Sequence, residues 1–304
     1  MTNIIFGKNG FVGKSVETTG ETPTKDECDL RNYESTLSYL NKFKDQKINI
    51  INLAARVAGV FYNKNHNVEM LYENTLISLN LIKAIKELNL DCYLLSISSV
   101  CAYDEALTME EGQYFNGLPS ENNFGYGISK KISYLSAKAL QIDNPNFKFA
   151  CLIPTNMYGE YDNISQQFSH VVPALFLKML KNDNEEVNIF GNANNIRNFL
   201  YVKDLGRVID FFVNERAEGY YNMASDEGTS IFNLTEKIKN ITNCTKKINF
   251  DFSGQSNRRI VKNDKIKTFY QQHGKDLQIT PLDEGLQNTY EWIKNKKYEI
   301  PSTN

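Results

Sequence analysis

The sequence predicts an α/β protein with a doubly wound parallel sheet and a smaller α/β part toward the C-terminus. Short apolar stretches alternate with amphipathic stretches of helical period as far as about residue 160. A glycine-rich segment directly follows the first apolar stretch. Beyond residue 160 the alternation becomes less regular, so we expect most of the substrate-binding part to lie there.

Composition narrows the class of protein. The chain has 304 residues, enough for one large domain or two intimate ones. Its 34 basic and 36 acidic residues give a net charge of −2 without a basic block, so neither nucleic acid nor an anionic membrane surface is expected as a partner. The N-terminus does not read as a signal peptide, no stretch approaches a membrane span, and the five cysteines form no C-x-x-C pair. We expect a cytoplasmic protein without a metal site.

The first strand, residues 3–6, runs into a G-x-x-G-x-x-G motif. In a Rossmann-type fold such a motif opens a helix, where free backbone N–H groups receive a pyrophosphate. A dinucleotide cofactor is therefore expected to contact Gly7, Asn9, Gly10, Phe11, Val12 and Gly13.

The segment after Gly13 is too short for an ordinary Rossmann unit. Only twelve residues separate Gly13 from Asp26, and neither a full helix nor a clear strand fits between them. We therefore expect an abbreviated crossover. No acidic residue is clearly placed for the ribose 2′-hydroxyl of NAD, whereas Lys8 and Lys25 are placed to meet a 2′-phosphate. This favours NADPH and leaves NAD open.

The next elements bring small residues and a serine to one edge of the sheet. A polar helix is expected over 32–46 and a longer helix over 68–88. Two buried strands end in Leu53-Ala54-Ala55 and in Ser99. Ligands of α/β proteins bind at the carboxyl ends of strands, so these residues are expected in the site. A polar loop over 104–123 is expected at the substrate entrance.

The second half continues with a helix that ends near residue 142 and a strand over 147–153, closed by Pro154 and Asn156. A helix to about residue 180 and a strand over 187–191 follow. We expect a dinucleotide-binding domain at 1–160, to which 197–222 return, and a substrate domain at 161–196 and 223–304.

Tyr126 and Lys130 are the residues that carry chemistry. Four positions apart on a helix, they share one face with Cβ atoms about 5–6 Å apart. A cation at that distance is expected to lower the pKa of the phenol toward neutrality. Such a phenol donates a proton well to a carbonyl oxygen that receives a hydride, and the Ser99 hydroxyl can hold that oxygen. The spacing therefore predicts carbonyl reduction with a nicotinamide.

With these residues the chain resembles the extended short-chain dehydrogenase/reductases, also called the NAD-dependent epimerase/dehydratase family, and within them the GDP-L-fucose synthase family. The resemblance spans nearly the whole chain. It rests on 7–13, 53–59, 99–103, Tyr126 with Lys130, 154–159, 169–174 and 197–204. It implies epimerisation and then reduction of a nucleotide-linked 4-keto sugar for cell-surface polysaccharides, and a homodimer formed by helices 68–88 and 125–142.

The resemblance also implies roles for individual residues. Ser99, Tyr126 and Lys130 would form the reductase triad, and Cys101 and His170 would be the base and acid of epimerisation. Substrate contacts are expected from Val100, Asn156, His170, Lys178, Arg197 and Arg259. Cofactor contacts are expected from the glycine loop and from Lys25, Leu53, Ala54, Ala55, Tyr126, Lys130, Pro154 and Asn156.

Several alternatives stay open at this point. Cys101 and His170 would also suit a reductase that uses them only to hold its sugar, a hexose or a heptose. A redox-neutral 4-epimerase or 4,6-dehydratase would hold NAD⁺ tightly, although Val100 and Cys101 stand where dehydratases of this superfamily place an acidic pair. A non-catalytic nucleotide-binding scaffold would explain the short segment after Gly13 but not the intact triad.

Overall fold

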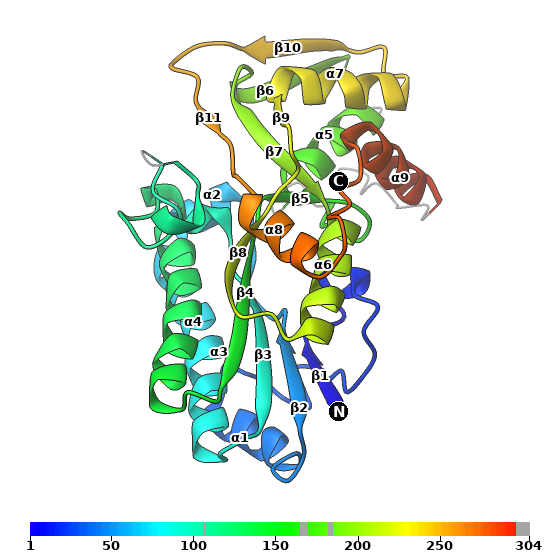
Figure 1. The fold of residues 1–304 in the computed structure, drawn as a ribbon. Coiled ribbons are helices and arrows are strands. Elements are labelled where there is room, and N and C mark those ends of the chain that lie inside the picture. Colours follow the sequence, from blue (N-terminus) through cyan, green and yellow to red (C-terminus); the bar gives the residue numbers. More distant parts are fainter. Residues whose placement is uncertain (106–107, 165–168, 182–184, 296–304) are drawn as a thin grey trace.

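Five parallel strands form the centre of the larger part of the molecule (Figure 1). The computed structural model describes residues 1–105, 108–164, 169–181 and 185–295. Residues 106–107 of the predicted loop and residues 165–168, 182–184 and 296–304 of the predicted substrate domain lie outside the described residues. The sheet order is β1 (Thr2–Phe6), β2 (Ile48–Asn52), β3 (Cys92–Ile97), β4 (Lys148–Pro154) and β8 (Gly219–Met223). The predicted parallel sheet is confirmed.

Helices cover both faces of this sheet. One face packs against α1 (Tyr33–Asn41), α3 (Asn67–Glu87) and α4 (Phe124–Asp143). The other face packs against α6 (Val202–Glu215) and α8 (Asp264–Gln272). Ile50 lies in the first cluster and Ile51 in the second, as the alternation of a strand that is apolar on both faces requires. The two long helices lie where they were predicted, whereas α1 ends five residues before the predicted end.

The first crossover is abbreviated, as predicted, but Gly13 does not open an α-helix. Only one 3₁₀ turn, η1 (Gly13–Ser15), follows β1 before α1 begins at Tyr33. The following residues, Val-Glu-Thr-Thr-Gly, are mostly poor helix formers, which accounts for the missing helix. Instead, the chain runs beside β1, where the backbone of Glu21 donates to Asn3 and accepts from Ile5 at 2.8 Å each.

Helix α6 supports this shortened segment. Asp210 accepts hydrogen bonds from the backbone N–H groups of Glu17 and Thr18 at 2.9 Å and from the Thr18 hydroxyl at 2.6 Å. A Cβ atom on Gly206 would lie 2.1 Å from the Ser15 carbonyl oxygen. The helix and the turn therefore meet backbone to backbone, which only a glycine permits.

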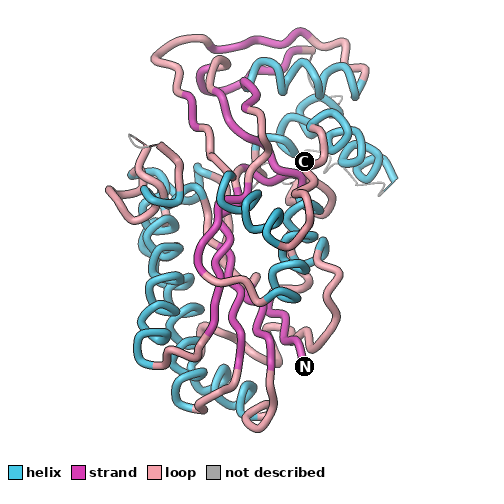
Figure 2. Tube along the Cα trace, in the orientation of Figure 1, coloured by secondary structure: helices cyan, strands magenta, loops and turns pink. Residues whose placement is uncertain are grey.

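A second, smaller part lies at the carboxyl ends of the five parallel strands, where Figure 2 shows its strands in magenta. One of its sheets contains β5 (Asn156–Tyr158), β7 (Ile196–Tyr201), β9 (Gly228–Ser230) and β11 (Arg258–Arg259). The other pairs β6 (Glu186–Asn192) with β10 (Lys247–Asp251). Its helices are α5 (Val171–Leu180), α7 (Ile231–Thr242) and α9 (Leu282–Asn295). They share one apolar cluster, which includes Phe176, Leu234 and Leu286.

The stretch that was expected to return to the first domain divides between the two parts. Strand β7 pairs with β5 and β11 in the second sheet, and α6 then packs against the five-stranded sheet. The domain boundaries themselves stay a prediction. Four short elements lie on connections: α2 (Val60–Asn65), η2 (Val100–Ala102), η3 (Glu111–Gln113) and η4 (Glu121–Asn123).

Candidate active site

The glycine loop forms a close-packed turn at the end of β1. Gly7 has φ of +79°, and a Cβ atom there would lie 2.7 Å from the backbone nitrogen of Ala54. A Cβ atom on Gly13 would lie 2.3 Å from the Gly7 carbonyl oxygen, and Gly10 donates to that oxygen at 3.0 Å. The structure thus brings the loop against Leu53 and Ala54, two of the residues expected to contact the cofactor. A bare backbone at the carboxyl edge of the sheet fits a dinucleotide pyrophosphate.

The two lysines proposed for a 2′-phosphate have different surroundings. The Lys8 ammonium donates to the carbonyl of Val16 and so ties the glycine loop to the shortened segment. Lys25 is exposed, and its charge helps to lower the pKa of Asp29, after the larger effect of Arg31. Of these two lysines, Lys25 is therefore the one that a phosphate could reach from solvent.

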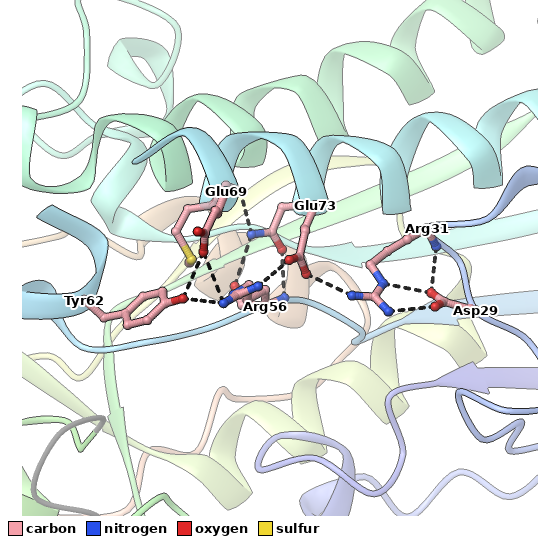
Figure 3. A network of polar contacts seen from close by, with 8 residues as sticks. Asp29, Arg31, Arg56, Tyr62, Glu69 and Glu73 are labelled. Atoms are coloured by element: carbon pink, nitrogen blue, oxygen red, sulfur yellow. Dashed lines mark hydrogen bonds and ion pairs between the residues drawn. The ribbon is translucent and has the colours of Figure 1, made fainter. Parts of the chain in front are cut away.

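A network of alternating negative and positive side chains begins at Asp29, four residues after Lys25 (Figure 3). Arg31 binds Asp29 and reaches Glu73 at 3.1 Å. Glu73 also pairs with Arg56, which contacts Glu69 and the Tyr62 hydroxyl. Because Arg56 directly follows Ala54-Ala55, the network fixes the end of β2 to α3. This network was not predicted from the sequence, since its longest contact joins residues 42 positions apart.

Ser99, Tyr126 and Lys130 lie together at the carboxyl ends of β3 and β4. The Lys130 ammonium lies 5.5 Å from the centre of the Tyr126 ring and donates to the Ile97 carbonyl at 3.0 Å. The Ser99 hydroxyl oxygen accepts from the backbone of Cys101 at 3.1 Å and also interacts with the Tyr126 hydroxyl. A Cβ atom on Gly127 would lie 2.7 Å from the Cys101 carbonyl oxygen, so η2 and α4 touch directly. The predicted grouping of these side chains is present.

The electrostatics of this group differ from the sequence-based expectation. Burial raises the pKa of Tyr126 well above its usual value, the charge of Cys101 adds to this, and the Ser99 hydrogen bond opposes it. Burial lowers the pKa of Lys130 to about 8. The prediction that Lys130 lowers the pKa of the Tyr126 phenol is therefore wrong, because burial removes both groups from water. A phenol with a raised pKa stays protonated at neutral pH.

Two buried residues that the sequence did not single out adjoin this group. Tyr114, from the predicted entrance loop, is fully buried, and its hydroxyl is hydrogen-bonded to Ser98 beside Ser99. Cys151 on β4 lies close enough for the charge of Lys130 to act on it, although burial is the main effect and raises its pKa to about 11. The middle of the entrance loop is therefore part of the packing under the site.

The two residues expected to move protons at carbon occupy different elements. Cys101 lies in η2 next to Ser99 and is partly exposed. His170 lies just before the first turn of α5, where its Nδ1 is 3.1 Å from the Asp162 carboxylate. Asp162 was not predicted. Its position eight residues before His170, within a loop, carried no recognisable spacing.

The proposed substrate residues fall into two groups. Arg197 and Arg259 are register partners on β7 and β11, and Arg259 also pairs with Glu105 at 2.8 Å. Asn156 donates to the Asn198 carbonyl at 3.0 Å, and Lys178 donates to the Asn188 carbonyl at 2.8 Å. These last two therefore hold strands of the second part. Val100 is buried in η2, next to Cys101.

Comparison with known proteins identifies the family. The model of the NAD dependent epimerase/dehydratase family matches residues 7–224, which include the glycine loop and the Ser99, Tyr126 and Lys130 group. The chain belongs to the NAD-dependent epimerase/dehydratase family. None of the helices within the described ranges has the length and apolarity to span a membrane. Over the same ranges, no three His, Cys, Asp or Glu side chains are grouped so as to hold a metal ion.

Within this family, three proteins illustrate the likeness. The chain is 29% identical over 313 residues to GDP-L-fucose synthase from Dictyostelium discoideum, covering 96% of this chain and 95% of the relative. It is 30% identical over 253 residues to GDP-L-colitose synthase from Yersinia pseudotuberculosis, covering 79% and 80%. The solved structure of a GDP-L-fucose synthetase from Naegleria fowleri bound to NADP has the same fold, with a TM-score of 0.83 at 22% identity over 98% and 94% of the two chains.

Proposed function

We propose that this family member is an NADPH-dependent reductase that acts on the C4 ketone of a nucleotide-linked 4-keto-6-deoxy sugar. The observation that carries the proposal is the buried group of Ser99, Tyr126 and Lys130 on the same sheet edge as the glycine loop. Relatives named for GDP-sugar synthesis support GDP as the nucleotide. The sugar is a hexose or a heptose, made for surface polysaccharide.

The protein's part in reduction is to supply and place a proton. When NADPH is bound, its nicotinamide supplies a hydride to C4 of the sugar. The Ser99 hydroxyl donates a hydrogen bond to the ketone oxygen, which gains negative charge. Tyr126, protonated because its pKa is raised, gives its proton to that oxygen. Lys130, fixed by the Ile97 carbonyl, then stabilises the phenolate until a solvent proton restores it.

Substrate binding rests on the paired arginines. Arg197 and Arg259 are register partners whose charges act on each other, and guanidinium groups bind phosphate oxygens in a bidentate way. Burial lowers the pKa of Arg197 to about 10, the charge of Arg259 adds to this, and Glu105 opposes it. A diphosphate between the two guanidinium groups would relieve their repulsion. Arg259 exchanges its Glu105 partner for the diphosphate when the substrate binds.

Inversion at C3 and C5 before reduction is the further activity we assign. The C4 ketone acidifies the protons on both neighbouring carbons, so one base and one acid on opposite faces of the sugar are sufficient. Cys101 removes a proton as the thiolate, and His170 returns one from the other face. The alternative for both residues is substrate contact alone.

NADPH rather than NAD is proposed as the cofactor. Lys25 is exposed at the end of the shortened segment, where the adenosine end of a dinucleotide is expected. The solved relative bound to NADP agrees with this assignment.

A cytoplasmic homodimer is proposed as the working form. Val68, Tyr72 and Leu79 recur at helical spacing along α3 and are 79%, 64% and 44% exposed. Leu135 and Ile142 are exposed on α4, the partner helix of α3. Such an apolar stripe on a helix pair is expected to be covered by a second copy of the same pair.

The deciding experiment incubates the protein with NADPH and GDP-4-keto-6-deoxymannose in D₂O. We expect NADPH oxidation together with deuterium at C3 and C5 of the product, and loss of the deuterium in Cys101→Ser and His170→Ala. Oxidation without deuterium would reduce Cys101 and His170 to substrate contacts. If neither this nor related 4-keto sugars, including heptoses, consume NADPH, the reductase proposal fails. Tightly bound NAD⁺ in the purified protein would then point to a redox-neutral enzyme, and no nicotinamide binding to a scaffold.

A further inference from the structure

At the start of α5, the partly exposed side chain of His170 pairs with the buried side chain of Asp162. His170 Nδ1 lies 3.1 Å from Asp162 Oδ1 and 3.4 Å from Oδ2. The Asp162 side chain is 4% exposed, whereas that of His170 is 37% exposed. Asp162 also accepts a hydrogen bond from the backbone of Asn163 at 2.8 Å. The carboxylate is thus fixed inside the protein, and the imidazole remains accessible from outside.

The three residues before Asp162, residues 159–161, each have close contacts with the surrounding structure. A Cβ atom on Gly159, which has φ of +147°, would lie 2.6 Å from Val202. The Glu160 carboxylate accepts from the Tyr201 hydroxyl at 2.7 Å and pairs with Lys203. Tyr161 has φ of +70°, a conformation that costs a bulky residue free energy and needs support from its surroundings.

That support comes from both parts of the molecule. The Lys14 ammonium lies 4.6 Å from the centre of the Tyr161 ring, and Trp292 on α9 packs edge-on against the same ring at 5.3 Å. Lys14 belongs to η1, the turn that ends the glycine loop. The backbone around Asp162 is therefore held by the cofactor loop on one side and by the second part on the other.

We propose that Asp162 is a positioning residue for epimerisation, which holds His170 by Nδ1 and leaves Nε2 as the atom that exchanges a proton with the sugar. This inference rests on the proposed function of the site. A carboxylate facing Nδ1 keeps a proton there in both charge states of the ring. The ring then donates and accepts only through Nε2.

Each inversion at carbon moves one proton to Cys101 and one proton from His170. The Cys101 thiolate takes a proton from the carbon next to the ketone, and the electron pair of the C–H bond moves into the enolate. The enolate carbon takes the Nε2 proton of the imidazolium on the opposite face, which leaves neutral His170 with its Nδ1 proton bound to Asp162. Solvent returns a proton to His170 and removes one from Cys101, so no oxidant or reductant is consumed.

The charges around His170 favour this acid role. Burial alone would lower the pKa of His170, but the hydrogen bond and the charge of Asp162 outweigh it and raise the pKa. Nearby, the charges of Glu160 and Lys203 pair with each other. Among the described residues, Asp162 is the charged group that acts on His170. More of the ring is therefore cationic at neutral pH than in free histidine.

The test compares Asp162→Asn with a matched control, Glu215→Gln. Glu215 lies 3.8 Å from His273 in the only other histidine–carboxylate pair found in the described residues. Deuterium wash-in at C3 and C5 is followed in D₂O with NADP⁺ and GDP-4-keto-6-deoxymannose, so that reduction does not proceed. In Asp162→Asn we expect wash-in to fall by about 10- to 100-fold at pH 8 and less at pH 6, with KM almost unchanged. Glu215→Gln should match the wild type.

The pH profile separates positioning from mere structural support. Removing the carboxylate lowers the pKa of His170, so the alkaline limb of wash-in should move to lower pH in Asp162→Asn. An unchanged limb, or a uniform loss at all pH values with a raised KM, would overturn the proposal.

A substrate-free measurement keeps this test independent of the proposed function. The chain has three histidines, so each can be assigned by single substitution and followed by ¹⁵N and ¹H NMR. We expect wild-type His170 to titrate above the usual value near 6.5 with its proton on Nδ1, and to titrate lower in Asp162→Asn. If the protein does not turn over 4-keto sugars, the function fails while this readout still decides the pair. A His170 protonated on Nε2 in the wild type would overturn the pairing even if Asp162→Asn did not fold.

Discussion

Arg197 and Arg259 are register partners on parallel strands in the second part, and the charge of Arg259 acts on Arg197. One carboxylate, that of Glu105, approaches them, and it binds Arg259. We expect two neighbouring cations with this one counter-charge to bind a doubly charged anion favourably.

Replacing either arginine by Met should weaken binding of the nucleotide. Each charge-assisted hydrogen bond contributes about 1.5–3 kcal/mol, which corresponds to about a 10- to 100-fold rise in KM with little change in kcat. Arg258→Met is the matched control, since Arg258 precedes Arg259 on β11 and is exposed. Calorimetry with GDP measures the effect directly. Equal weakening by all three substitutions would show general electrostatics rather than a site.

Lys130→Met should abolish turnover and yet stabilise the fold. Burial lowers the pKa of Lys130 to about 8 from the 10.5 expected in the unfolded chain, a difference that costs about 3 kcal/mol when the group is protonated. Loss of the hydrogen bond to Ile97 offsets part of the gain, so we expect a net gain of about 1–2 kcal/mol at pH 7.

The stability gained by Lys130→Met should decrease as the pH rises. Between pH 8 and about 10.5 the unfolded chain binds more protons at Lys130 than the folded chain, so wild-type stability from this group rises with pH. The advantage of Lys130→Met should therefore shrink across that range. Urea unfolding at pH 7 and pH 10 measures it, and a substituted protein that is less stable at pH 7 would contradict the burial penalty.

Gly206→Ala should destabilise a helix that alanine would normally favour. Alanine adds about 1 kcal/mol of helix propensity over glycine, but its Cβ atom would meet the Ser15 carbonyl oxygen at 2.1 Å. We expect a net loss of about 1–3 kcal/mol and weaker NADPH binding, because the displaced turn belongs to the glycine loop. Gly112→Ala is the control, as nothing lies within 4 Å of its Cβ position. Thermal melts with and without NADPH distinguish the outcomes.

Lys25→Glu should reverse the cofactor preference. A carboxylate repels the 2′-phosphate of NADPH and can accept from the 2′-hydroxyl of NAD. We expect KM for NADPH to rise by about 10-fold or more, with NADH affected little. Lys8→Gln tests the other lysine: since its ammonium binds the Val16 carbonyl, it should weaken both cofactors alike. An unchanged ratio in Lys25→Glu would place the phosphate elsewhere.

Tyr72→Asp should separate the proposed dimer. A charge in the middle of the stripe on α3 would be buried by a second copy, which is unfavourable by several kcal/mol. Leu118→Asp alters a similarly exposed apolar residue in the loop before α4 and should leave the mass in solution unchanged. Light scattering at matched concentrations reads the result. A wild type that is monomeric would refute the dimer outright.

Most strands and helices up to about residue 191 could be predicted because their apolar patterns are local, whereas the elements from α6 to α9 were not assigned from the sequence. Local patterns also predict the glycine loop and the shared face of Tyr126 and Lys130 on one helix. The pKa of Tyr126 could not be predicted, since it depends on burial by elements distant in sequence. The pairing of Asp210 with Thr18 spans 192 residues, and that of Glu105 with Arg259 spans 154. No short-range pattern encodes such contacts.

The support of the glycine loop by α6 has a consequence for synthesis of the chain. A ribosome makes residues 7–20 early but reaches Asp210 about 190 residues later, and the end of α6 lies at Glu215. Until α6 leaves the exit tunnel, the loop lacks the carboxylate that holds Glu17 and Thr18 and the helix that packs on Ser15. We therefore expect a nascent chain to complete its glycine loop only after more than two thirds of its length has been made, so that a chain truncated before α6 would bind a dinucleotide poorly.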